Sequence, residues 1–219
     1  MGHAMGNGGR KTRDGVGACI LAAGASRRMG APKLLAPFAG TTLVERAVDE
    51  AVASGVGPCA VVTGCYASQM QMLLEGRPVR IVQNRQWESG QASSVACAAR
   101  WARDEGLRGL LLMVADQPFV GRDHLRNLAR AFRDKEGCAL AATACNGRWG
   151  NPILFAKSQF GKLEGLAGDR GARPVAAKLL ESDPDSCVLV KSPRADAFCD
   201  IDTPEELAEV ERAFLAAQQ

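Results

Sequence analysis

Short apolar segments without polar alternation recur along this chain, and they constrain its fold more than any other feature of the sequence. They run over residues 16–22 (VGACILA), 59–63 (CAVVT) and 110–115 (LLLMVA). A strand with one face in water alternates apolar and polar residues, whereas a strand covered on both faces is apolar throughout. The three segments therefore predict strands inside a sheet that has helices on both faces.

Segments with helical patterning separate these strands. Residues 42–54 predict a helix because Thr42 and Glu45 form a capping box at its start and Gly55 ends it. The remaining elements are expected at the following positions: helices at about 67–75, 92–106, 125–132 and 174–181 and after 202, and strands at 79–82, 138–143, 152–156 and 187–190.

The chain is expected to comprise a disordered, glycine-rich tail over residues 1–15 and a single domain over residues 16–219. Alternating strands and helices make that domain an α/β fold with a mostly parallel open sheet and helices on both faces. The strands on either side of Gly147 and Gly150 are expected to form a hairpin or an edge extension. Ligands of such sheets bind beyond the carboxyl ends of the strands, so polar residues after strands are candidates for a site.

Charge and cysteine content exclude several functions. The net charge is +3, of which Arg10, Lys11 and Arg13 against Asp14 supply +2, so the domain itself is nearly neutral. A protein that binds nucleic acids or membrane surfaces would show a basic stripe or a basic amphipathic helix. Because the domain is nearly neutral, neither a nucleic acid nor a membrane is expected as a partner. No apolar run approaches the ~18 residues of a membrane span. The eight cysteines form no C-x-x-C pair and lie mostly in apolar runs, which favours reduced thiols and the cytoplasm.

The first of three polar clusters after predicted strands is LAAGASRRMGAPK, residues 21–33. Its small residues let backbone N–H groups approach a polyphosphate, and Arg27, Arg28 and Lys33 bring positive charge to it. The spacing of its glycines matches neither a dinucleotide-binding motif nor a P-loop. The alternative interpretation is a solvated basic loop after a buried strand.

The second cluster is Asp116-Gln117-Pro118, directly after the most apolar run of the chain. A carboxylate at the end of a central strand is placed to hold Mg²⁺, which takes one or two carboxylates and completes its octahedron with phosphates and water. Alternatively, Asp116 only begins a turn that Pro118 fixes.

The third cluster is Asp200-Ile201-Asp202, ahead of the last helix. If Ile201 points into the core, the two carboxylates share the opposite side of an extended segment. Either aspartate is then a candidate for a second metal ligand, and because Thr203 is the expected N-cap of the helix, Asp202 is left free for that role. The alternative is that either aspartate simply favours the positive N-terminus of that helix.

Together the clusters resemble the MobA-like NTP transferase family, most closely its members that transfer a cytidylyl group to the molybdenum cofactor. The resemblance covers about residues 16–210 and is carried, in order, by LAAGASRRMGAPK, DQP, NRQWESGQASS, GNPILF, GDRGAR and DIDTPEEL. It implies the Rossmann-like three-layer nucleotidyltransferase fold. It also implies Mg²⁺-dependent transfer of CMP from CTP to the terminal phosphate of molybdopterin, with release of pyrophosphate.

The resemblance assigns roles to individual residues. Arg28, Lys33 and Asp116 are expected in catalysis, and Asp116 with Asp202 on Mg²⁺. The nucleotide is expected against the following residues: Leu21, Ala22, Ala23, Gly24, Ala25, Ser26, Arg28, Lys33, Thr63, Gly64, Ser93 and Ser94. The acceptor is expected against Asn151, Asp169, Arg170 and Arg173. An equal alternative for Ser93 and Ser94 is that they are small residues chosen for close packing. The alternative for Arg170 and Arg173 is that they are simply solvated at the start of a helix.

Three positions bear on the substrates. Ala23 makes the first motif LAAG, as in cytidylyl-transferring members, rather than the LAGG of guanylyl-transferring ones, and a side chain there penalises the larger purine. Asn151 stands where many relatives have His, and Gln91 where Met often follows a glycine. Both departures fall in the region assigned to the acceptor, so a different acceptor is an open alternative.

Rival functions remain at this point. Within the enzyme class they are GMP transfer and transfer to another phosphorylated small molecule. The rival from another class is a non-catalytic chaperone that delivers the pterin to a molybdoenzyme. A chaperone would not need the full set of charged residues, and the presence of Arg28, Lys33, Asp116 and Asp202 therefore disfavours it. The resemblance also implies a molybdoenzyme or its maturation chaperone as a protein partner.

The proposed reaction does not need a histidine. A phosphate nucleophile is already ionised near neutral pH, so no general base is required, and His124 is expected on the surface of a helix.

Overall fold

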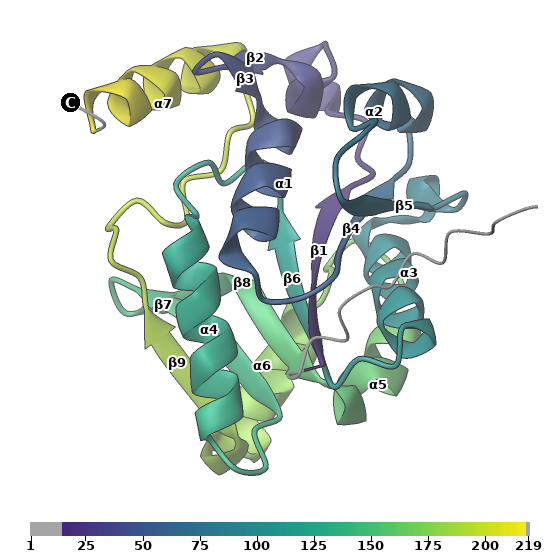
Figure 1. Cartoon of the computed structure of the whole chain (residues 1–219), viewed down its shortest axis with the longest axis vertical. Coiled ribbons are helices and arrows are strands. Elements are labelled where there is room, and N and C mark those ends of the chain that lie inside the picture. The colour runs from purple at the N-terminus through teal and green to yellow at the C-terminus, as the bar shows by residue number, and fades with distance from the viewer. Residues whose placement is uncertain (1–14, 218–219) are drawn as a thin grey trace, which may run out of the picture.

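The computed structural model describes residues 15–217, and at Arg27 the backbone alone, so the predicted tail lies outside the described residues except for Gly15. A seven-stranded sheet crosses the domain between two layers of helices (Figure 1). Its strands are β1 (Val16–Ala22), β4 (Cys59–Thr63), β5 (Val79–Gln83), β6 (Gly109–Val114), β7 (Leu140–Cys145), β8 (Arg148–Ala156) and β9 (Cys187–Lys191). The helices are α1 (Leu43–Ser54), α2 (Ala67–Leu73), α3 (Gln91–Asp104), α4 (Arg122–Asp134), α5 (Phe160–Glu164), α6 (Arg173–Ser182) and α7 (Pro204–Ala216), and a small hairpin joins β2 (Pro37–Phe38) to β3 (Thr41–Thr42).

The sheet is mostly parallel, as predicted. Its strand order is β5-β4-β1-β6-β8-β7-β9, and β8 alone among these seven strands runs antiparallel to its neighbours. The hairpin expected around residue 147 is β7–β8, but Gly150 lies inside β8 rather than in the turn. A Cβ at Gly150 would lie 3.1 Å from a ring carbon of Phe198, so this glycine serves close packing.

Residues on the two faces of the sheet explain the apolar runs. In β1, Val16, Ala18 and Ile20 face the layer that contains α1 and α4, whereas Cys19 faces the layer that contains α3. Burial on both sides removes the need for polar alternation. Within residues 15–217, every helix is too short or too polar to span a bilayer.

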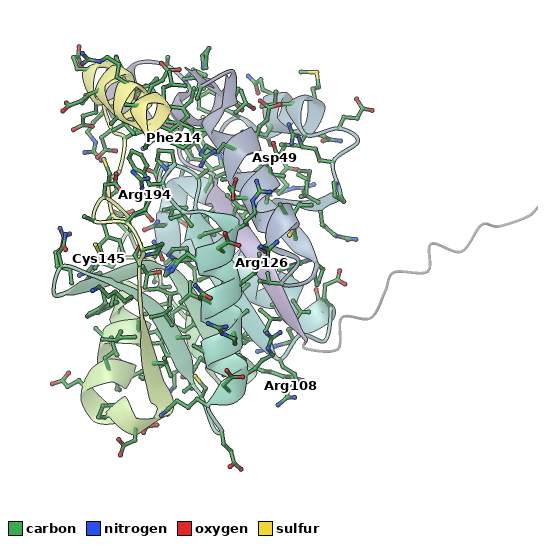
Figure 2. The ribbon with its side chains drawn as sticks, turned by 60° about the vertical axis from the view of Figure 1, so that its left-hand side comes forward. Asp49, Arg108, Arg126, Cys145, Arg194 and Phe214 are labelled. Carbon is green, nitrogen blue, oxygen red and sulfur yellow. The ribbon has the colours of Figure 1, made fainter. Side chains whose placement is uncertain are left out.

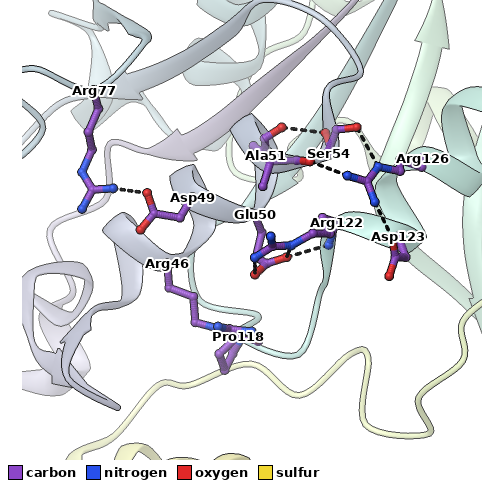
Figure 3. Close-up of polar contacts among 11 residues, drawn as sticks. Arg46, Asp49, Glu50, Ala51, Ser54, Arg77, Pro118, Arg122, Asp123 and Arg126 are labelled. Carbon is purple, nitrogen blue, oxygen red and sulfur yellow. Dashed lines mark hydrogen bonds and ion pairs between the residues drawn. The ribbon is translucent and has the colours of Figure 1, made fainter.

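Polar contacts between α1 and α4 hold the loop that follows β6 (Figure 3). The Glu50 carboxylate accepts hydrogen bonds from the Arg122 guanidinium and from the Arg122 backbone N–H. Burial raises the pKa of Glu50, but these hydrogen bonds outweigh it and leave that pKa below its ordinary value. Arg46 donates to the carbonyl of Pro118, and this contact fixes the segment just beyond Asp116.

The C-terminal helix is anchored by aromatic packing. Phe214 of α7 lies 5.2 Å from Phe38 and 5.9 Å from Phe119, measured between ring centroids. Phe214 and Arg194 lie at the same end of the molecule in Figure 2, and the Arg194 guanidinium stacks over Phe119. Because Thr203 caps α7 with the predicted capping box, this packing also fixes the Asp202 segment that precedes the helix.

His124 corrects one expectation, since it is buried rather than on the surface of its helix. Only 4% of the residue is exposed, and its Nε2 atom lies 2.9 Å from the Thr143 hydroxyl on β7. His124 lies four residues before Leu128, so both side chains share the inward face of α4. A histidine reads as polar in a sequence pattern, and only the packing shows that it belongs to the buried face.

Burial also lowers the pKa of His124 to about 4 from its ordinary 6.5. Between these two pH values the unfolded chain binds more protons at this residue than the folded protein, so stability falls as the pH is lowered from about 6.5 to 4. We expect wild type to lose more stability over this interval than His124→Gln, by about 1–3 kcal/mol, in urea unfolding. The variant keeps an N–H donor and all the titrating carboxylates, so parallel losses would contradict the prediction.

Candidate active site

A cleft of about 580 Å³ lies at the carboxyl ends of β1 and β6. The segment over residues 21–33, which ends β1 and forms the loop after it, is called the first loop below. All of its predicted nucleotide-binding residues line the cleft: Leu21, Ala22, Ala23, Gly24, Ala25, Ser26, Arg28 and Lys33. Asp116, Asp202 and Ser94 reach the same cleft from three other segments of the chain. The side chain of Arg27 lies outside the described part of the structure.

The first loop owes its shape to its small residues. Ser26 and Gly30 both adopt the left-handed conformation, with φ of 51° and 65°, at either end of a short turn of helix. The Ala23 carbonyl accepts a hydrogen bond from the Cys65 N–H, which ties the loop to the end of β4. A Cβ at Gly64 would lie 2.5 Å from that carbonyl oxygen, so glycine permits the close approach.

The structure does not bring Thr63, Gly64 or Ser93 to the cleft. Thr63 is fully buried in β4, and Gly64 packs beneath the first loop. Ser93 and Ser94 both accept hydrogen bonds from the side-chain amide of Asn84, at 2.8 and 3.0 Å. The serines therefore hold the loop before α3 in place, and Ser94 additionally lines the cleft.

Lys33 lies at the centre of the charged residues. It is 8% exposed, and its Nζ donates to Asp116 Oδ2 at 2.7 Å, to Asp202 Oδ1 at 3.2 Å and to the Ile201 carbonyl. Arg28 binds the other oxygen of Asp202 at 2.7 Å, with 75% of its side chain exposed. The two cations thus differ in position: Lys33 is enclosed by the carboxylates, and Arg28 faces the open cleft.

The two aspartates fit a Mg²⁺ site of the kind that substrate phosphates complete. Asp116 and Asp202 converge on one ammonium group, and Asp116 keeps its Oδ1 atom without a partner among the described residues. No group of three or more His, Cys, Asp or Glu side chains suited to a metal ion occurs within residues 15–217. Two carboxylates suit Mg²⁺, whose remaining positions go to phosphate oxygens and water.

Asp200 lines the neighbouring cavity together with this pair, but it has no hydrogen bond to Lys33. Ile201 is fully buried, as the extended-segment hypothesis requires, and Asp200 accepts a hydrogen bond from Gln117 at 2.8 Å. Asp202, not Asp200, shares Lys33 with Asp116. The geometry therefore favours Asp202 over Asp200 as the partner of Asp116.

A second cavity, of about 370 Å³, adjoins the first and shares Arg28, Asp116 and Asp202 with it. Asn151 and Arg173, two of the predicted acceptor residues, line it. Arg170 lines a smaller hollow of about 150 Å³ that also contains Asn151 and Arg173. Asp169, by contrast, lines the first cleft.

Aromatic residues of the second cavity were missed from the sequence. The Arg173 guanidinium lies 4.8 Å from the ring centroid of Trp149, and Arg148 lies 5.9 Å from that of Phe198. Trp149 stands directly before the GNPILF motif, so its position was the available signal. Phe198 carried none, because only the fold of the loop before α7 brings it to Gly150.

An α/β sheet with a loop of small residues and two aspartates at its carboxyl edge is the arrangement expected of a nucleotidyltransferase, and comparisons with known proteins agree. The MobA-like NTP transferase domain matches residues 18–183. Purine catabolism protein PucB of Bacillus subtilis is 31% identical over 205 residues, which cover 89% of this chain and 95% of PucB. The chain therefore belongs to the MobA-like NTP transferase family.

Two further relatives extend the comparison. Nicotine blue oxidoreductase of Paenarthrobacter nicotinovorans is 28% identical over 177 residues, which cover 78% of this chain and 79% of that protein. The solved structure of a nucleotidyl transferase from Methanothermobacter thermautotroptrophicus is 26% identical with a TM-score of 0.79 and covers 92% of this chain and 98% of its own. The shared fold confirms the Rossmann-like architecture.

Removal of the Lys33 cation tests how far the site depends on it. In Lys33→Met two neighbouring carboxylates and the Ile201 carbonyl lose their shared donor, so we expect the free energy of unfolding to fall by about 1–3 kcal/mol. Urea unfolding monitored by circular dichroism measures the change. Lys178→Met, at an exposed position on α6, is the matched control and should be neutral. Equal stability of the two variants would show that Lys33 does not organise the aspartates.

Proposed function

We propose that this nucleotidyltransferase transfers CMP from CTP to the terminal phosphate of molybdopterin, or of its molybdenum-loaded form, with Mg²⁺ as cofactor. One observation carries the proposal: two adjoining cavities meet at Arg28, Asp116 and Asp202. The first cavity has a backbone loop suited to a triphosphate, and the second has basic and aromatic side chains suited to a planar, phosphorylated acceptor. The reacting phosphates would meet where the cavities join.

The reaction asks little covalent chemistry of the protein. An oxygen of the acceptor phosphate attacks the α-phosphorus of CTP, the bond from this phosphorus to the bridging oxygen breaks, and pyrophosphate leaves with the electron pair. Mg²⁺ on Asp116 and Asp202 would neutralise phosphate charge and stabilise the leaving group. Arg28, which faces the cleft, would contact the triphosphate, while Lys33 bonds to both aspartates and holds them in position.

Ala23 supports CTP as the donor. It lines the first cleft and is 6% exposed, and its carbonyl accepts a hydrogen bond from the Cys65 N–H, which fixes the backbone there. A fixed side chain there leaves less room for a purine than glycine would, and a steric penalty of this kind selects against the larger base. A molybdoenzyme or its maturation chaperone would then receive the dinucleotide product.

The substrates are tested by incubation of the purified protein with Mg²⁺, molybdopterin and each of the four NTPs, with pyrophosphate release as the readout. We expect release at least tenfold faster with CTP than with GTP, and a smaller difference in Ala23→Gly. Release with GTP but not CTP would overturn the base assignment. Pterin binding without pyrophosphate from any NTP would favour the chaperone.

Asp116 is tested separately. Asp116→Ala should reduce turnover by at least a hundredfold while the far-ultraviolet circular dichroism stays unchanged, because the carboxylate would hold Mg²⁺ at the phosphates and does not pack in the core. Asp104→Asn, at an exposed position near the end of α3, is the control and should retain full activity. Near-normal turnover of Asp116→Ala would show that Asp116 only begins a turn.

A further inference from the structure

The ladder between β7 and β8 is interrupted beside the second cavity. Ala142 pairs with Ile153, but the next residue, Thr143, pairs with Gly150. Asn151 and Pro152 therefore lie opposite no residue of β7 and form a two-residue bulge. Bulges next to binding sites re-aim side chains, and Asn151 lines both hollows assigned to the acceptor.

A buried hydrogen-bond chain holds this bulge. Thr143 is fully buried, and its hydroxyl donates to the Pro152 carbonyl at 2.9 Å. Because Asn151 and Pro152 have no ladder partner on β7, the bond from Thr143 to the Pro152 carbonyl supplies a contact across the gap. The contact joins the unpaired residues of β8 to the regular part of β7.

His124 fixes the direction of the Thr143 hydroxyl. Its Nε2 atom lies 2.9 Å from the hydroxyl oxygen, whose single hydrogen already goes to the Pro152 carbonyl. The hydroxyl can only accept from His124, so Nε2 carries the proton of a neutral imidazole. Burial keeps the pKa of His124 near 4, which favours this neutral donor form around pH 7.

We propose that Thr143, oriented by His124, is a positioning residue for the acceptor: its hydroxyl holds the bulge that presents Asn151 to the second cavity. The inference rests on the proposed function in taking that cavity as the acceptor site. The NTP cleft is built on the loops after β1 and β6 and does not include the bulge. Loss of the Thr143 hydroxyl should therefore affect the acceptor and spare the nucleotide.

The test compares Thr143→Val, which removes the hydroxyl at nearly constant shape, with Thr143→Ser, which restores it. We expect Thr143→Val to raise the KM for molybdopterin at least fivefold and to leave the KM for CTP within twofold of wild type, with Thr143→Ser within twofold for both. Ser54→Ala removes a buried hydroxyl at the end of α1 and is the control for general destabilisation, with both KM values unchanged. His124→Phe should act in the same direction as Thr143→Val, by a smaller factor, and replaces it if the valine variant fails to fold.

The side-chain amide resonances of Asn151 in ¹⁵N spectra provide a readout that needs no turnover. They should shift in Thr143→Val and return to the wild-type position in Thr143→Ser. If wild type releases no pyrophosphate, the proposed function fails, and the resonances still decide whether Thr143 positions Asn151. Equal changes in both KM values, or Asn151 resonances that do not respond to Thr143→Val, would overturn the inference.

Discussion

The contact between the Lys33 ammonium and two aspartates is the interaction on which the site depends. Asp116 follows the central strand β6 and Asp202 precedes α7, so 83 and 169 residues separate them from the lysine that they share. Two carboxylates close enough to contact the same ammonium group would repel each other without that cation. Lys33 also binds the Ile201 carbonyl, and the Ile201 N–H donates to the Asp116 carbonyl, so the three segments are joined by backbone as well as by charge.

The remaining structure serves to keep these segments together. The capping box of α7 and the packing of Phe214 hold the C-terminal segment, while Arg46 holds the carbonyl of Pro118 from α1. A nearly neutral domain is compatible with a nucleoside triphosphate as substrate. Arg28 and Lys33 lie with Asp116 and Asp202 at one edge of the sheet, so the charged groups of the site are local and balanced and do not show in the net charge.

The sequence predicted most of the fold, and it did so where a physical pattern was strong. The buried strand β1 and the helix α1 with its cap lie at the expected bounds, because unbroken apolar runs and capping boxes depend on neighbouring residues. Predictions failed where long-range packing decided the outcome. His124 read as a surface residue and Gly150 as part of a turn, yet His124 contacts Thr143 and Gly150 packs against Phe198, both from other parts of the chain.

The candidate site divides in the same way. The sequence determined the small residues of the first loop and the presence of two acidic clusters, since these are local patterns of neighbouring residues. The tertiary structure decided that Asp202, rather than Asp200, shares Lys33 with Asp116. The two aspartates have the same chemistry, and they differ only in the direction that the burial of Ile201 and the start of α7 give to each side chain. It also decided that Phe198 lies beside Gly150 and Asn151, since distances between residues far apart in the chain are set by the packing of the whole domain.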